Sequence, residues 1–360
     1  MNTTHVFVLE DKEKAAYFLN DLENIENYQK ETLAQRTILF FPRSARVPYQ
    51  IETVDNANVA MRTEVLNLLR KKPKGQWIVT YPEALAEKVI GLASLEQKTF
   101  EIELGNTLNH EIVDEVFQEY GFTKVDFVYE PGQYAVRGGI IDVFSFSYDH
   151  PYRIELFGDT IDSIRKFDPV DQLSLSSMTK ATIVPNIQDE SQIDSTINFL
   201  EFVDADAVIW SIECTNAPQI WEKELDRAQL QFQKVSGMIK HKAPEELYAH
   251  ATDWMRLLKG KRLVEMGPTA LFMEAQEIQY TMTPQPSFSK NFDMLSKHLV
   301  SKAKEGFDQV VTAGQAKQLE RLHQIFEDKQ IIVQYTPHLI ELSEGFVDND
   351  QQIALYTDHQ

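Results

Sequence analysis

The chain has 360 residues, of which 43% are hydrophobic and 25% are charged, a balance typical of folded globular proteins. Its formal net charge of −20 disfavours sequence-independent binding to DNA or RNA and docking on anionic membranes, because both surfaces are negatively charged. A single cysteine, Cys214, excludes an internal disulfide framework and a multi-cysteine metal site. The sequence has neither a signal-peptide pattern nor a membrane-spanning apolar run, so we expect a cytoplasmic protein.

The first part of the chain alternates strands and helices. HVFVLE (5–10), RTILFFP (36–42) and QWIVTYP (76–82) have the composition of buried strands. Each is followed by a segment with the pattern of a helix. This alternation predicts a parallel α/β sheet. We therefore assign residues 1–98 to the first part of an α/β domain. Because the chain opens on a strand, we expect this domain to be truncated at its start.

The pattern changes at residue 99. TFEIELG is an alternating strand, LNHEIVDEVFQEYGF is a helix, and the strands after it are separated by the turn signals PG, RGG, SYDHP and FGD. Such a series predicts a small α+β domain with an antiparallel sheet over 99–185. The pair Gly158–Asp159 predicts a two-residue hairpin turn that places Leu156 beside Ile161 on the core face.

The third part returns to the α/β pattern at INFLEFVDADAVIWSIE (197–213), within a segment we assign to 186–280. The polar run at 221–240 predicts a long exposed helix. Two prolines and the lack of periodicity predict a linker at 281–291. Residues 292–360 form a small α/β domain in this interpretation, with strands at QIIVQYTP (330–337) and QQIALYTD (351–358). The predicted fold class is a multi-domain α/β protein with an inserted α+β domain.

The sequence offers no convincing catalytic set. It contains no G-x-x-x-x-G-K-[ST] phosphate loop, and the acids Asp204 and Asp206 precede an apolar strand, where a magnesium ligand normally follows one. HEIVD (110–114) has an aspartate where a zinc-protease helix needs its second histidine. We therefore predict that this chain is not an enzyme and binds no metal and no cofactor.

The stretch YRIELFGD stands out because its strand carries charges and an aromatic ring on one face. Side chains alternate along a strand, which gives a core face of Tyr152, Ile154 and Leu156 and an opposite face of Arg153, Glu155 and Phe157. Arginine and aromatic residues are enriched at binding hot spots, so this face is a candidate docking surface. The alternative is an ordinary solvated strand whose phenyl ring is tucked under a loop or a neighbouring domain.

The wider segment EPGQYAVRGGIIDVFSFSYDHPYRIELFGDTIDSIRKFDPVDQLS (130–174) resembles the UvrB-homology region of bacterial transcription-repair coupling factors, the Mfd family. The shared pattern is a Gly-aromatic strand, an Arg-Gly pair, Ile-Asp-Val-Phe, Arg-x-Glu-Leu-Phe, Ile-Asp-Ser-Ile-Arg-x-Phe-Asp and Gln-x-Ser. The flanking α/β segments resemble the helicase-like domain of that region, in degenerate form. Residues 290–360 resemble, more weakly, the small domain before the polymerase-interacting domain.

The resemblance implies a partner. In this family the region imitates UvrB and docks UvrA, the damage-recognition ATPase of nucleotide-excision repair. The matching contact residues here are Arg137, Arg153 and Phe157. Glu155 would orient Arg153 or meet a basic group on the partner, and Gly138 with Gly139 would form a bulge that lets Arg137 project across the sheet.

The resemblance also covers only the front part of the family. ATP and magnesium belong to its motor domains, and RNA polymerase and DNA are contacted by other domains, all of which are absent from this chain. We expect an intramolecular contact with the missing C-terminal domains and none with a membrane. Two alternatives remain: a UvrB-like ATP-dependent helicase or nucleotide-binding domain, and a protein that binds DNA directly.

Overall fold

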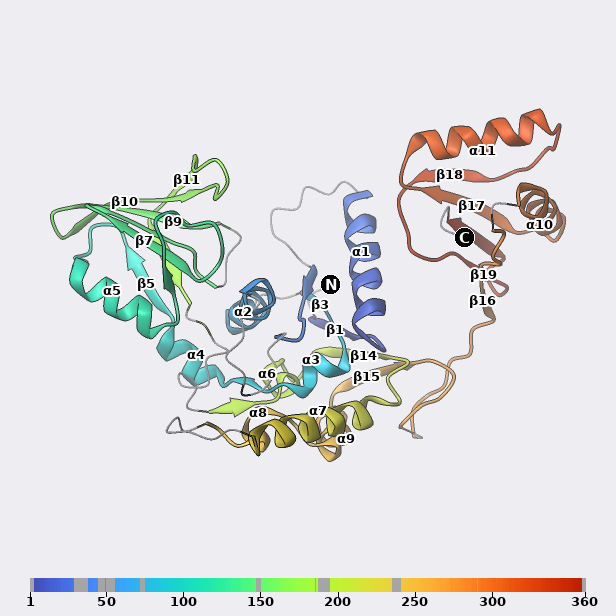
Figure 1. Ribbon diagram of the computed structural model, residues 1–360. Helices are drawn as coiled ribbons and strands as arrows, with labels where there is room; N and C mark the ends of the chain where they lie inside the picture. The colour runs from blue at the N-terminus through green and yellow to red at the C-terminus, as the bar shows by residue number, and fades with distance from the viewer. Residues whose placement is uncertain are drawn as a thin grey trace. The chain divides into compact units, whose positions relative to one another are not determined.

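The computed structural model describes residues 3–28, 38–44, 49, 56–71, 75–146, 150–184, 186, 195–234, 241–272, 274–289 and 291–357 (Figure 1). Two compact units make up the chain: unit 1 comprises Met1–Ala15 with Thr37–Ala270, and unit 2 comprises Ala16–Arg36 with Leu271–Gln360. Helix α1 (Lys12–Tyr28) crosses this division. In the described ranges, no helix is both long enough and apolar enough to cross a membrane.

Unit 1 contains a five-stranded sheet in the order β15-β14-β1-β3-β2, and every pair in it is parallel. The central strands are short apolar runs with buried side chains, as expected where helices cover both faces. The parallel α/β sheet predicted from the sequence is therefore confirmed. Its strands are β1 (His5–Val8), β2 (Ile38–Phe40), β3 (Trp77–Thr80), β14 (Val208–Ile212) and β15 (Arg262–Met266).

Helix α7 covers most of the long exposed helix predicted at 221–240, of which residues 235–240 lie outside the described ranges. The prediction of exposure is wrong for one face of α7, because Trp221, Leu225 and Ala228 are buried and the Trp221 indole donates to the carbonyl of Pro82 at 2.9 Å. The helices are α2 (Asn56–Arg70), α3 (Pro82–Ala86), α4 (Leu92–Lys98), α6 (Phe199–Phe202), α7 (Ala217–Phe232), α8 (Pro244–Leu247) and α9 (Ala251–Leu258).

The middle domain of unit 1 is built on a six-stranded sheet in the order β11-β10-β9-β8-β7-β6. All its pairs are antiparallel except β6–β7. Helix α5 (His110–Glu119) packs Val113 and Phe117 into the main core on one face. The strands are β6 (Thr123–Lys124), β7 (Gln133–Arg137), β8 (Ile140–Val143), β9 (Tyr152–Phe157), β10 (Thr160–Phe167) and β11 (Ser174–Met178).

Two antiparallel pairs connect the middle domain to the rest of the chain. β5 (Phe100–Glu103) pairs with β12 (Lys180–Ile183), so that Phe100 lies opposite Ile183. β4 (Val89–Ile90) pairs in the same way with β13 (Thr196–Ile197). The chain therefore enters and leaves the middle domain at neighbouring positions.

Both tight turns of the sheet depend on glycine. Gly138 and Gly158 have φ of 57° and 62°, each at the first position of a two-residue turn, which is the arrangement glycine favours in hairpins. Leu156 pairs with Ile161 as predicted. The expected bulge at Gly138 is wrong: β7 and β8 keep an unbroken register through Arg137 and Ile140. Register shifts lie instead in β10, between Ile161 and Ser163 where it pairs with β9 and between Lys166 and Phe167 where it pairs with β11.

Unit 2 contains a mixed sheet in the order β16-β19-β20-β17-β18 over a core that includes Phe288, Leu299 and Phe326. The strand expected at 330–337 begins only at Thr336, and Ile332 is exposed. The elements are β16 (Met282–Pro284), α10 (Phe292–Lys304), β17 (Asp308–Ala313), α11 (Ala316–Asp328), β18 (Thr336–Leu339), β19 (Phe346–Asp348) and β20 (Ile353–Thr357).

The segment 281–291, expected to be a linker, contributes a strand to this sheet. β16 pairs with β19, and the buried Gln285 side chain exchanges hydrogen bonds with the backbone of Thr357. Pro284 is tolerated in β16 because this is an edge strand, where a missing N–H leaves no gap in the ladder, and Pro286 lies beyond the end of the strand. Proline content therefore misled the linker prediction.

Candidate protein-docking surface

The face of the six-stranded sheet opposite α5 carries a row of charged side chains. Asp142 on β8 pairs in register with Arg153 on β9, which pairs in turn with Arg165 on β10. Asp142 is completely buried, and it is the single charged residue of β8, whose other residues are apolar. A buried carboxylate must be compensated by cations or hydrogen bonds, and two arginines supply both here.

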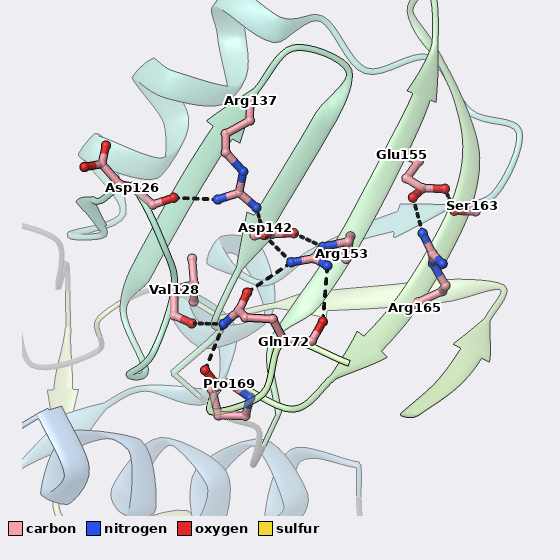
Figure 2. A network of polar contacts seen from close by, with 10 residues as sticks. All are labelled: Asp126, Val128, Arg137, Asp142, Arg153, Glu155, Ser163, Arg165, Pro169 and Gln172. Carbon is pink, nitrogen blue, oxygen red and sulfur yellow. Dashed lines mark hydrogen bonds and ion pairs between the residues drawn. The ribbon is translucent and has the colours of Figure 1, made fainter. Parts of the chain in front are cut away.

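Arg153 makes a bidentate contact with Asp142 (Figure 2). Its Nε donates to Oδ1 at 2.7 Å and its Nη2 to Oδ2 at 2.8 Å. The hydrogen bonds to Asp142 raise the pKa of Arg153, which keeps it charged. Its guanidinium also lies 4.4 Å from the centre of the buried Phe167 ring, a stacking that arginine favours. Only 17% of the Arg153 side chain is exposed.

Arg137 reaches the same carboxylate from β7. It pairs with Asp142 Oδ2 through Nη2, while its Nη1 donates to the carbonyl of Asp126. Its guanidinium lies 5.1 Å from the centre of the Phe127 ring. These bonds use two of the five N–H donors of an arginine, so three have no partner among the described residues. With 35% of its side chain exposed, Arg137 can offer these donors to another molecule.

Gln172 supports Arg153 from the loop between β10 and β11. Its side-chain oxygen accepts from Arg153 Nη2 at 3.1 Å and its backbone carbonyl accepts from Nη1 at 3.4 Å. Its amide nitrogen donates to the carbonyls of Val128 and Pro169. The residue has φ of 63°, a conformation that costs a non-glycine residue on the order of 1 kcal/mol. The hydrogen bonds that Gln172 makes therefore offset a strained backbone.

Phe157 lies at the end of β9, beside the turn at Gly158, and 83% of it is exposed. Within unit 1, therefore, no described loop covers the ring. Glu155, on the same face, accepts from Ser163 Oγ at 2.7 Å and pairs with Arg165. Glu155 was expected either to orient Arg153 or to meet a basic group on a partner. The first role belongs to Asp142, which binds Arg153 directly.

The structure thus brings Arg137 and Arg153 together on Asp142 and places Phe157 on the same face, four residues along β9 from Arg153. Sequence reasoning missed Asp142 and Gln172. Their signal was present: an acid inside an apolar strand, and a glutamine within the quoted motif. What the sequence lacked was the pairing of the strands, which alone places Asp142 between the two arginines.

The arginine–aspartate cluster (Arg137, Asp142 and Arg153) has one net positive charge and outward N–H donors. A guanidinium held rigidly in this way suits a carboxylate on another molecule, and an exposed phenyl ring on the same face suits an apolar pocket. Among the residues with described positions, no group of three or more histidine, cysteine or acidic side chains could hold a metal ion.

Residues 100–188 match the sequence family described as "UvrB interaction domain". The chain is 32% identical over 180 residues to a transcription-repair-coupling factor of Myxococcus xanthus, a match that covers 50% of this chain and 15% of the relative. A coupling factor of Borreliella burgdorferi is 20% identical over 326 residues, which is 81% of this chain and 28% of the relative. UvrABC system protein B of Aliivibrio fischeri is 25% identical over 130 residues, or 36% and 19%. The family resemblance predicted from the motifs is confirmed.

Proposed function

This chain is related to the transcription-repair coupling factors, and on that premise we propose that it is a non-catalytic recruitment module that docks the excision-repair protein UvrA by imitating UvrB. The matched domain contains every residue of the arginine–aspartate cluster and Phe157. In this proposal the chain links stalled transcription to repair. RNA polymerase and DNA are contacted by other domains of the coupling factor.

One observation carries the proposal most directly. Arg137 is held by a buried carboxylate and yet keeps N–H donors that no described residue uses. An arginine that only neutralised Asp142 would be superfluous, because Arg153 already contacts both oxygens of that carboxylate. The spare donors of Arg137 and the exposed ring of Phe157 suit a partner with a carboxylate and an apolar pocket.

The alternative of a nucleotide-binding enzyme is less well supported. Ligands of parallel α/β sheets bind beyond the carboxyl ends of the strands. In this sheet three of those ends are followed by acids, Glu10 after β1, Glu83 after β3 and Glu213 after β14, whereas Arg43 after β2 is already paired with Glu87 and Glu224. Acidic side chains at this edge repel a polyphosphate. We therefore expect no thermal stabilisation of the chain by magnesium and ATP.

The test is a calorimetric titration of UvrA with the chain and with two variants, Arg137→Ala and Phe157→Ala. Each should weaken binding by about 2 kcal/mol if it lies at the centre of the contact. Ile112→Ala is the matched control, because Ile112 is also exposed but lies on α5, on the other face of the sheet. Unchanged affinity in both variants would reject this site, and no binding by the unaltered chain would reject the function.

A further inference from the structure

The cluster and Phe157 are too small to form a stable interface by themselves. A stable contact buries roughly 800 Å² on each partner. Arg153 is largely covered and Arg137 is two-thirds covered, so little of their surface is available. If UvrA binds here, the contact must extend over neighbouring residues. This inference accordingly rests on the proposed function.

Two loops border the arginines, and both present apolar side chains to solvent. In the loop after β6, Phe127 and Tyr129 are exposed. In the loop between β10 and β11, Val170 is 85% exposed and Leu173 is also exposed. We call these four residues the apolar collar. Exposed apolar side chains gathered on two loops beside one charged cluster are typical of an interaction site.

Two contacts hold the loops of the collar against the arginine–aspartate cluster. The ring of Phe127 lies under the Arg137 guanidinium. Gln172, between Val170 and Leu173 in sequence, bonds to Arg153 on one side and to the carbonyl of Val128 on the other (Figure 2). The glutamine thereby fastens both loops and an arginine to one another.

The loops are also fixed in shape. Val128 is buried with Ala135, Phe144 and Phe167 in a small second core on this face. The backbone N–H of Val170 donates to Asp168 Oδ1 at 2.7 Å, which closes a turn. A surface ordered before binding loses little conformational entropy when a partner docks. The loops of the collar are therefore already ordered for binding, although the collar side chains remain exposed in this chain.

We propose that the apolar collar is the second half of the UvrA contact, and that it receives a UvrA surface in which a carboxylate is surrounded by apolar side chains. The carboxylate of UvrA accepts hydrogen bonds from the outward N–H donors of Arg137. The apolar side chains around that carboxylate pack on the collar and exclude water. Exclusion of water matters because a charge pair is stronger when it is shielded from solvent.

The test is a titration of UvrA with the double variant Val170→Ser, Leu173→Ser. The control is Ile332→Ser, whose side chain is 89% exposed in unit 2. We expect the double variant to bind about tenfold more weakly, with a less negative heat-capacity change because less apolar surface is buried. Its dependence on salt should equal that of the unaltered chain, whereas Arg137→Ala should reduce that dependence.

The outcomes separate the two proposals. If Arg137→Ala weakens binding while the double variant binds like the unaltered chain, the collar is not part of the contact and the docking function stands. A double variant that weakens binding by the same factor as the Ile332→Ser control would reject the collar as well. If the unaltered chain does not bind UvrA, both proposals fail.

Discussion

Arg153 donates to both carboxylate oxygens of Asp142, and Arg137 pairs with one of those same oxygens from another strand. One buried acid thus fixes the direction of two guanidinium groups on the outer face of the sheet. This relationship predicts that binding and stability depend on the three residues to different extents.

Asp142→Asn should destabilise the middle domain by about 2–3 kcal/mol, because it removes the charge that compensates two partly covered arginines. Chemical denaturation followed by circular dichroism measures the change. Asp162→Asn is the control, since Asp162 is exposed at the register shift between Ile161 and Ser163. A variant as stable as the control would mean that solvent, rather than Asp142, compensates the arginines.

Arg137→Ala and Arg153→Ala should differ in their effects on stability. Loss of Arg137 leaves Asp142 held at both oxygens, so stability should change by less than about 1 kcal/mol while UvrA binding weakens. Loss of Arg153 leaves a buried carboxylate with one partner, so stability should fall by about 3 kcal/mol. Parallel denaturation and calorimetry test this prediction, and equal destabilisation by both variants would contradict it.

Gly132→Ala should destabilise the middle domain by about 2–4 kcal/mol. Gly132 has φ of 83°, and a methyl group there would lie 2.3 Å from Cζ of the buried Phe146. The control is Gly105→Ala, which has φ of 84° but nothing within 4 Å of the added carbon. The control carries only the backbone cost of about 1 kcal/mol, so equal losses in the two variants would show that Phe146 moves aside.

His298 should make unit 2 sensitive to acid. Burial, and then the neighbouring Lys302, lower the pKa of His298 below its ordinary value of 6.5, although Glu305 opposes this. Because the unfolded chain takes up the proton at higher pH than the folded chain does, stability should fall as pH drops below 6.5 and stay constant above it. NMR titration of the histidine Cε1–H resonances gives the pKa directly.

His298→Gln should reduce the loss of stability below pH 6.5. Burial lowers the pKa of His5 in unit 1 as well, so part of the pH dependence should persist in that variant. His5→Gln provides the complementary control. A His298 resonance that titrates at or above pH 6.5 would exclude this histidine as the acid-sensitive group.

Local patterns predicted much of the middle domain. Alternation along YRIELF separated the buried Tyr152 and Ile154 from the outward Arg153, and the glycine turn fixed the pairing of Leu156 with Ile161. These features depend on neighbours in sequence, so one chain suffices to predict them. The parallel sheet of unit 1 followed from the alternation of strands and helices for the same reason.

Features that depend on distant residues escaped prediction. Asp142 gains its role only when β8 lies between β7 and β9, and the burial of Trp221 depends on α3, far from it in sequence. The segment of β16 resembled a linker because Pro284 and the following Pro286 are typical of loops, whereas pairing with β19 makes Met282–Pro284 a strand. In each case the missing information was the partner element.

The pairing of Phe100 with Ile183 has a consequence for engineering. Paired backbones of this kind lie roughly 5 Å apart, so the excised ends could be rejoined by a short peptide or grafted into a surface turn of an unrelated carrier. A segment whose two ends meet is tolerated as an insertion far more readily than one whose ends are remote. The middle domain is thus suited to insertion into another protein, which would then carry Arg137, Arg153 and Phe157 on its surface.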